Sequence, residues 1–245
     1  MIPCHLVFLF SAICRKTILI FRSAHDILLS KKKSRGDSAM TEKEKCFAGK
    51  LYDPFCEGMP EERRRAHELC QKYNAIPESD TDAREKILDE LLPERGEGVY
   101  LQGPIQFDFG THIKMGKGSY ANFNFCVLDE NRVTIGENVF IGPNCSILTP
   151  IHPLRWQERN TFFNEKTGEN TNLEYSAPVT IGDNCWIGGD VTIMPGVTIG
   201  SGSVIGAGAV VSKSIPENSL AYGVPCRVIR EITDEDSLKN KPELF

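Results

Sequence analysis

The stretch from Ile181 to Pro216 repeats every six residues, and this period restricts the fold more than any other feature of the chain. It divides into IGDNCW, IGGDVT, IMPGVT, IGSGSV, IGAGAV and VSKSIP. An α-helix or an alternating strand has no such period, whereas a β-helix has, because each coil buries its aliphatic positions against the next. The first and fifth positions should therefore face inward: Ile181, Ile187, Ile193, Ile199, Ile205 and Val211, with Cys185, Val191, Val197, Ser203, Ala209 and Ile215.

Glycine fills the second position of the repeat at residues 182, 188, 200 and 206. Because glycine adopts a positive φ without steric cost, we expect these residues to form tight corners between strands. The same phase continues more loosely from Tyr100 through Phe107, Ile113, Ile135, Ile141 and Ile147. It stops over residues 149–177, which are polar and carry no repeat. Long insertions in solenoids usually serve binding or catalysis.

The chain divides into a single body with appendages. We expect an N-terminal extension over residues 1–39, a helical segment over 40–98, a β-helix over 99–216 with an inserted loop at 149–177, and a tail over 217–245. The patterns predict helices at Glu61–Tyr73, directly after Pro60, and at Asp80–Leu92, which has an acidic first turn. The fold class predicted from the repeat is mainly β.

Composition narrows the function. Residues 1–39 hold seven Lys and Arg against two Asp and Glu, while the remainder holds 21 against 31. An acidic body argues against nucleic-acid binding. The apolar start is too short and too interrupted by Arg15 and Lys16 for a membrane-spanning helix; we interpret residues 1–39 as a disordered tail or a mis-started reading frame. Cys145 and Cys185 occupy packing positions, which favours a reduced, cytoplasmic protein.

His152 is the strongest candidate for chemistry. It stands where the repeat stops, directly before Pro153, and an imidazole suits a general base at neutral pH. A zinc site of the kind found in γ-class carbonic anhydrases needs about three histidines, and this solenoid offers only His112 and His152. A nucleophilic Cys145 is disfavoured because its position is a packing position.

A group of cations follows the last regular coil. Lys213 ends the repeat, and Arg227 and Arg230 would share a face if the tail is helical. Together with Ser212 they suit a phosphate-bearing ligand, although solvated surface charge is an alternative of similar weight.

Several segments of the chain together resemble the galactoside and maltose O-acetyltransferases. They are AGKLYDPFCEGMPEERRRAHELCQKYN, YANFN, the HP at the repeat break, NCWIGG, VTIMPGVTIGSGSVIGAGAVVSK and GVPCRVIREI, and they run in order from Thr41 to Asp236. The resemblance implies a left-handed parallel β-helix with three-sided coils. It also implies a homotrimer with sites between subunits, acetyl-coenzyme A (acetyl-CoA) as donor, no metal, and a sugar as acceptor.

The resemblance also implies roles for individual residues. His152 matches the catalytic base, and Glu174 matches a position next to the acceptor from which it would orient His152. The other acceptor-side matches are Asp108, Asn122 and Glu130, with Asp53 one place out of register. Those on the coenzyme A side are Trp186, Gly189, Ala207, Ser212, Lys213, Arg227 and Arg230.

Three alternatives remain open at this stage. The first is an acetyltransferase whose acceptor hydroxyl belongs to a non-sugar compound such as a xenobiotic. The second is a non-catalytic binding protein built on the same solenoid, since fold does not fix function. A metal-dependent hydratase is the third alternative. The joint presence of His152 and the cations around Lys213 favours the acetyltransferase over a binding protein.

Overall fold

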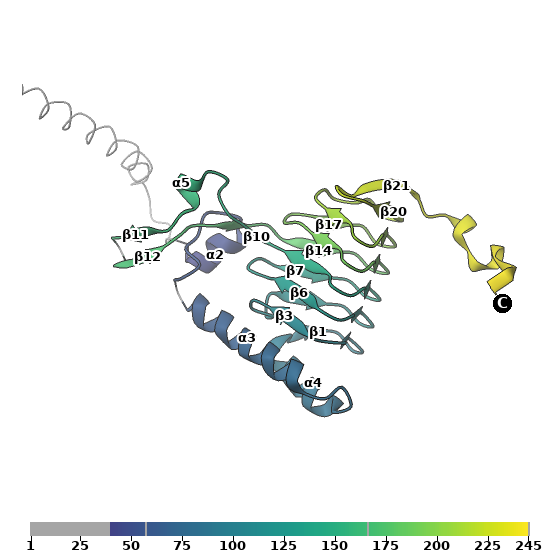
Figure 1. The fold of residues 1–245 in the computed structure, drawn as a ribbon, viewed down its shortest axis with the longest axis horizontal. Helices are drawn as coiled ribbons and strands as arrows, with labels where there is room; N and C mark the ends of the chain where they lie inside the picture. The colour runs from purple at the N-terminus through teal and green to yellow at the C-terminus, as the bar shows by residue number, and fades with distance from the viewer. Residues whose placement is uncertain (1–39, 57, 166, 245) are drawn as a thin grey trace, which may run out of the picture. The chain divides into compact units, whose positions relative to one another are not determined.

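The chain winds into a parallel β-helix in which each coil gives one strand to each of three sheets (Figure 1). The structure is a computed structural model that describes residues 40–56, 58–165 and 167–244. The expected extension over residues 1–39 lies outside the described residues. The prediction of a mainly β solenoid with helices at its N-terminal end is confirmed.

The three sheets consist of short strands that stack from coil to coil. The first sheet contains β1 (Glu94–Arg95), β4 (Ile113–Met115), β7 (Val133–Ile135), β14 (Val179–Ile181) and β17 (Thr198–Ile199). The second contains β2 (Tyr100–Leu101), β5 (Tyr120–Ala121), β8 (Phe140–Ile141), β15 (Trp186–Ile187), β18 (Val204–Ile205), β20 (Ser219–Tyr222) and β21 (Arg227–Glu231). The third contains β3 (Ile105–Phe107), β6 (Phe125–Leu128), β9 (Ser146–Leu148), β16 (Thr192–Ile193) and β19 (Val210–Val211).

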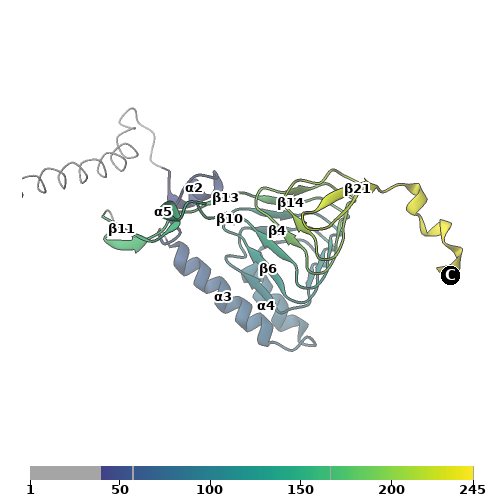
Figure 2. The ribbon, with the colours of Figure 1, turned by 45° about the horizontal axis from the view of Figure 1, so that its top comes forward.

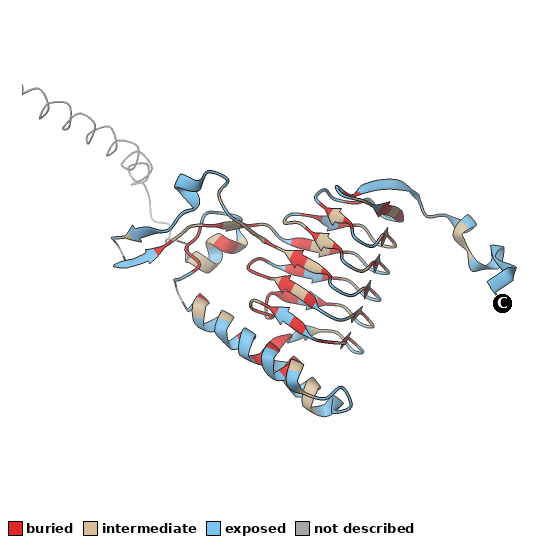
Figure 3. Cartoon of the chain, viewed as in Figure 1, coloured by how far each residue is buried: buried red, intermediate tan, exposed pale blue. Residues whose placement is uncertain are grey.

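The predicted inward positions form the core. Parallel pairing places like residues above one another, so that Ile181 lies beside Ile199 and Ile187 beside Ile205. Every first-position and fifth-position residue of the repeat is buried, including the polar Ser203. Figure 3 shows this inner surface as buried segments that recur in each coil. Each buried Ile or Val contributes about 1.5–3 kcal/mol, so the stack is the main source of stability.

The glycines at the second position do not have the expected conformation, and that prediction is wrong. Positive φ occurs instead at the fourth position, at Asn184, Asp190, Gly196, Gly202 and Gly208. The four glycines at this position are needed because the next coil passes too close for a side chain. A Cβ at Gly200 would lie 2.4 Å from the backbone nitrogen of Glu217.

One corner of the coil, between the third sheet and the first, is wider than the others in the N-terminal half. Between the aligned positions Val127 and Ile135 the chain takes eight residues, against six between Ile193 and Ile199. The insertion leaves the solenoid at this same corner, between β9 and β14. We call residues 108–112, 128–132 and 148–178 the wide corner.

The insertion is an arm with structure of its own. Its two ends pair as antiparallel strands, β10 (Pro150–Ile151) with β13 (Tyr175–Ser176). Beyond them lie α5 (Trp156–Arg159) and a hairpin of β11 (Phe162–Asn164) and β12 (Glu169–Thr171). Figures 1 and 2 both show this hairpin projecting away from the coils.

Within the part of the chain that the structure describes, three helices precede the coils, and in both views the two longer ones lie beside the first coil (Figures 1 and 2). They are α2 (Glu42–Phe47), α3 (Met59–Ala75) and α4 (Thr81–Leu91). The buried face of α3 packs on β3, where the side chain of Asn74 makes two hydrogen bonds with the backbone of Ile105. The two predicted helices are confirmed, with α3 beginning at Met59. The chain ends in the 3-10 helices η1 (Asp234–Asp236), η2 (Leu238–Asn240) and η3 (Pro242–Leu244).

Alanine substitution at two glycines distinguishes two reasons for needing glycine: a close approach of the next coil and a left-handed backbone conformation. We expect Gly200→Ala to lower the free energy of unfolding by about 3 kcal/mol, because its Cβ would overlap the next coil. Gly208→Ala places its Cβ in open space and costs only the left-handed conformation, about 1 kcal/mol. Urea unfolding followed by circular dichroism measures both losses. A larger loss for Gly208→Ala would contradict this account of the repeat.

Candidate functional site

His152 and Glu174 lie together at the root of the arm. Ile151 of β10 is opposite Tyr175 of β13, so the next position along each strand brings His152 beside Glu174. Nδ1 of His152 is 3.6 Å from Oε2 of Glu174; the histidine side chain is half exposed and the glutamate is buried. A carboxylate beside Nδ1 favours the tautomer with its proton there, which leaves the lone pair of Nε2 available as a base.

Tyr52 holds the carboxylate of Glu174 from the other side. The phenol donates a hydrogen bond to Oε1 at 2.6 Å. The two residues also pair through their backbones, with N–H to carbonyl distances of 2.9 and 3.2 Å. Tyr52 is fully buried, and burial together with the charge of Glu174 raises the pKa of Tyr52 far above its ordinary value. Its hydroxyl therefore remains a donor.

Two further acidic residues predicted for the site lie at the same corner. Glu130 follows β6 and is buried; burial and its neighbour Asp108 raise the pKa of Glu130 well above its ordinary value. Oδ1 of Asp108, which follows β3, lies 3.1 Å from Nε2 of His67 on α3. Burial thus favours the neutral, protonated form of the Glu130 carboxyl over the charged one.

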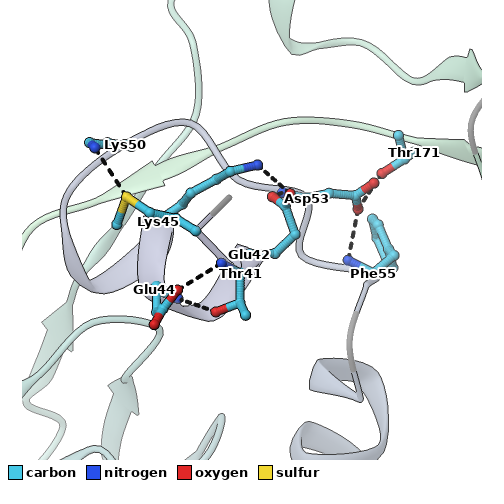
Figure 4. Close-up of polar contacts among 9 residues, drawn as sticks. Thr41, Glu42, Glu44, Lys45, Lys50, Asp53, Phe55 and Thr171 are labelled. Carbon is cyan, nitrogen blue, oxygen red and sulfur yellow. Dashed lines mark hydrogen bonds and ion pairs between the residues drawn. The ribbon is translucent and has the colours of Figure 1, made fainter. Parts of the chain in front are cut away.

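Asp53 is a buried link between the N-terminal segment and the arm (Figure 4). Its Oδ1 accepts hydrogen bonds from the backbone N–H of Phe55 at 3.0 Å and from the hydroxyl of Thr171 at 2.6 Å. Its own backbone N–H donates to Oε2 of Glu42 at 2.8 Å. These contacts account for its burial, and its predicted role toward the acceptor stays a prediction.

A groove of about 570 Å³ runs along the outer face of the second sheet. Its wall is a row of large side chains, because β5, β8, β15 and β18 align Tyr120, Phe140, Trp186 and Val204. Three of the residues predicted for the coenzyme A side line the groove, Trp186, Gly189 and Ala207, and so does Asn122, which was predicted for the acceptor side. The groove offers flat apolar surface and exposed backbone, which suits a long ligand with an aromatic end.

The predicted cations lie beyond the groove, and the prediction of a helical tail is wrong. Arg227 and Arg230 belong to β21, which pairs antiparallel with β20. They share a face all the same, because an irregularity in the pairing places them opposite Tyr222 and Leu220, which point the same way. Leu220 lines the groove. Ser212 and Lys213 are exposed at the end of the preceding coil.

Arg230 already has a partner within the chain. Its guanidinium makes two hydrogen bonds to Asp236 in η1, at 2.7 and 2.8 Å. The contact lowers the pKa of the Asp236 carboxyl to about 2. The Arg230 side chain is exposed and that of Asp236 is partly exposed, so the pair contributes little to stability and Arg230 can exchange Asp236 for another anion.

His152 and the groove lie apart in a single chain. The groove belongs to the second sheet and the corner after it, whereas His152 belongs to the wide corner, and the third sheet separates these two corners. A ligand lying in the groove of one chain therefore does not reach His152 of that chain. The arrangement requires either two separate sites or two copies of the chain.

The remaining candidates for chemistry have packing roles. His112 is buried between Phe47 and Phe109, and burial lowers its pKa. The described residues contain no group of three or more His, Cys, Asp or Glu side chains placed to hold a metal ion. Cys145 and Cys185 are buried with free thiols whose pKa values are raised by burial. None of the described helices is long and apolar enough to cross a membrane.

Two residues that contact the wide corner, Tyr52 and His67, were not predicted from the sequence as part of the site. Tyr52 reaches Glu174 across 122 residues of chain, and His67 reaches Asp108 across 41. The only signal for Tyr52 is that it follows the Gly-Lys-Leu motif directly; His67 stands on a helix with no distinguishing pattern around it.

Three family profiles match the chain. The maltose acetyltransferase hexapeptide capping motif matches residues 45–96, which include α3 and α4. The bacterial transferase hexapeptide with six repeats matches residues 178–213, and the hexapeptide repeat of succinyl-transferase matches residues 132–152.

Similar proteins are known in sequence and in structure. Galactoside O-acetyltransferase from Escherichia coli K12 is 45% identical over 193 residues, 79% of this chain and 90% of that protein. A putative acetyltransferase from Saccharomyces cerevisiae is 41% identical over 195 residues, 79% of this chain and 94% of that one. The structure of galactoside acetyltransferase in complex with coenzyme A matches with a TM-score of 0.74 at 44% identity, covering 80% of this chain and 94% of that one. Maltose O-acetyltransferase from Clostridium difficile matches with a TM-score of 0.73 at 42% identity, covering 80% and 100%.

The raised pKa of Glu130 predicts a specific dependence of stability on pH. Between the ordinary glutamate pKa of 4.5 and the raised folded value, the unfolded chain binds fewer protons, so stability falls as pH rises. Glu130→Gln imitates the protonated form, and we expect a flatter profile of melting temperature from pH 5 to 8. Glu137→Gln, at an exposed carboxyl, is the control. Equal slopes for wild type and Glu130→Gln would contradict the assignment.

Proposed function

This chain belongs to the hexapeptide-repeat acetyltransferases, which use acetyl-CoA, and we propose that it transfers the acetyl group to a hydroxyl of a sugar. The acceptor resembles maltose, glucose or a galactoside, since proteins named galactoside and maltose O-acetyltransferase are 45% and 42% identical to the chain. The observation that carries the proposal is the half-exposed imidazole of His152 beside the buried carboxylate of Glu174. A base oriented in this way is what a hydroxyl nucleophile needs.

In the proposed mechanism Nε2 of His152 removes the proton of the acceptor hydroxyl while its oxygen attacks the thioester carbonyl. The tetrahedral intermediate then collapses, the C–S bond breaks, and the thiolate of coenzyme A takes the proton from the imidazolium. General-base help of this kind supplies roughly two to four orders of magnitude in rate. Holding both substrates together in one cleft supplies much of the remaining rate enhancement.

The acceptor lies at the wide corner in this proposal. Glu130, protonated through burial, and Asp108 offer one donor and one acceptor of hydrogen bonds, the combination that a pair of sugar hydroxyls recognises. Asp53 keeps the arm in place next to them. Asn122 lines the groove, and we propose that its side chain contacts the acceptor hydroxyl from the opposite side.

The donor lies along the second sheet. Trp186, Gly189 and Ala207 line the groove for the pantetheine arm and thioester. The cations Lys213, Arg227 and Arg230, with Ser212, bind the phosphates at its end, since planar guanidinium groups bind phosphate through paired hydrogen bonds. Arg230 exchanges its carboxylate partner Asp236 for a phosphate on binding.

The proposed active unit is a homotrimer in which His152 of one copy meets the groove of the next. The support is the separation of the two halves within one chain. A ring of three copies brings each wide corner to a neighbouring groove by one repeated contact. The free, buried thiols of Cys145 and Cys185 suit the reducing cytoplasm that we propose as its location.

Removing the base tests the reaction. We expect His152→Ala to lower kcat by roughly two to four orders of magnitude with little change in the KM for acetyl-CoA and in melting temperature, because the side chain is half exposed. Release of free thiol is measured with a panel of maltose, glucose, galactosides and non-sugar alcohols. Near-normal turnover in a well-folded variant would remove His152 from the mechanism. Preference for a non-sugar alcohol would replace the acceptor and leave the chemistry in place.

Mixing two inactive variants tests the shared site. His152→Ala lacks the base, and Ala207→Trp blocks the groove with a bulky side chain. After the two are unfolded and refolded together in equal amounts, about a quarter of the contacts in a ring of three copies join an intact base to an intact groove. We therefore expect activity to return to about a quarter of the wild-type value. If His152 served the groove of its own chain, no activity would return.

A further inference from the structure

Tyr52 is a fully buried residue of the N-terminal segment that contacts the wide corner, and neither the proposed mechanism nor the family resemblance gives it a role. It lies in a small buried cluster with Cys46, Met59 and Phe109. Its hydroxyl points at Oε1 of Glu174, 2.6 Å away. The other oxygen of that carboxylate, Oε2, is the one next to Nδ1 of His152. Tyr52, Glu174 and His152 thus form a chain of three groups that leads from the interior to the exposed imidazole.

We propose that Tyr52 is a positioning residue for catalysis, because it fixes the carboxylate of Glu174 so that only Oε2 faces Nδ1 of His152. The inference rests on the proposed function of His152 as base. It adds a group from the N-terminal segment that touches no substrate and acts through Glu174.

The geometry gives Tyr52 control over the orientation of the carboxylate. A carboxylate without an inner partner rotates about its terminal bond, which has a broad torsional preference. The Tyr52 hydroxyl removes this freedom with a hydrogen bond to a charged acceptor, which contributes about 1.5–3 kcal/mol. The backbone pairing of Tyr52 with Glu174 at 2.9 and 3.2 Å keeps the two side chains in register.

The orientation of the Glu174 carboxylate determines the tautomer of His152. An oriented carboxylate at Nδ1 retains the proton there, so that Nε2 is always the basic nitrogen. The Nδ1–Oε2 separation of 3.6 Å is longer than a hydrogen bond, and such contacts commonly shorten when the substrates bind. Without Tyr52 the imidazole divides its population between two tautomers, one of which has no base at Nε2.

Tyr52→Phe removes the hydroxyl and retains the ring. We expect kcat to fall roughly ten- to a hundredfold, the usual effect of losing a group that orients a functional histidine, with an unchanged KM for acetyl-CoA. Tyr73→Phe is the matched control, because Tyr73 is equally buried and donates to the carbonyl of Leu101 in the first coil. The kcat of Tyr73→Phe should stay within about twofold of wild type, because the hydrogen bond that it loses stabilises the fold and has no part in the proposed reaction.

Two further readouts distinguish positioning from general packing. In a Glu174→Gln background, Tyr52→Phe should lower kcat no further, because the two residues act as one unit. Nitrogen-15 NMR of labelled histidine at a pH where the imidazoles are neutral reports the tautomer, with His152→Ala used for assignment. We expect the Nδ1–H form in wild type and in Tyr73→Phe, and a mixture in Tyr52→Phe.

The Glu174→Gln protein tests the same inference with Tyr52 intact. If Tyr52 holds the Oε1 position, it fixes the amide oxygen there and turns the amide NH2 toward His152, which moves the proton to Nε2. If Tyr52 does not position the group, the amide flips and the Nδ1–H form persists. That persistence, or a Tyr52→Phe variant with the same kcat and tautomer as Tyr73→Phe, would overturn the inference. The NMR readout needs no substrate, so a failure of the proposed reaction is recognised separately.

Discussion

The structure depends on the stacking of aliphatic side chains from one coil to the next. Ile181 beside Ile199 in the first sheet and Ile187 beside Ile205 in the second are examples of the columns of stacked residues inside the solenoid. Because this contact involves only the inward positions, a corner can lengthen without disturbing it. Val133 still pairs with Val179 although the entire arm lies between them. The fold therefore tolerates a large insertion at one corner and keeps its core.

The wide corner shows how this tolerance brings polar side chains from distant segments together. The extra residues after β3 and β6 bring Asp108 and Glu130 to the level below the arm, and the antiparallel root of the arm brings His152 beside Glu174. The N-terminal segment closes the corner from behind through Tyr52 and Asp53. Burial also distinguishes the acidic groups, because it raises the pKa of Glu130, while Glu174 lies beside an imidazole.

The second sheet, in contrast to the wide corner, keeps the regular repeat. Its outward positions carry large flat side chains in register, Tyr120, Phe140 and Trp186 among them, and its corner glycines leave the backbone open. The donor groove that we propose here is therefore a product of the repeat itself, while the acceptor site is a product of the departures from the repeat. Since the two lie at different corners, the proposed reaction joins them through association between copies.

The solenoid, its inward residues and the place of the insertion could all be predicted from the sequence, because a period of six allows one kind of packing. The sequence also marked His152, since a repeat that stops identifies the residue where it stops. It could not assign the glycines of the second position, because the distance to the next coil is absent from a linear pattern. It could not give the strand at Arg227–Glu231 either, since pairing with β20 overrides local preference. The contact between Tyr52 and Glu174, which are 122 residues apart, is visible only in the folded chain, because a hydrogen bond between distant segments exists only after the coils have stacked.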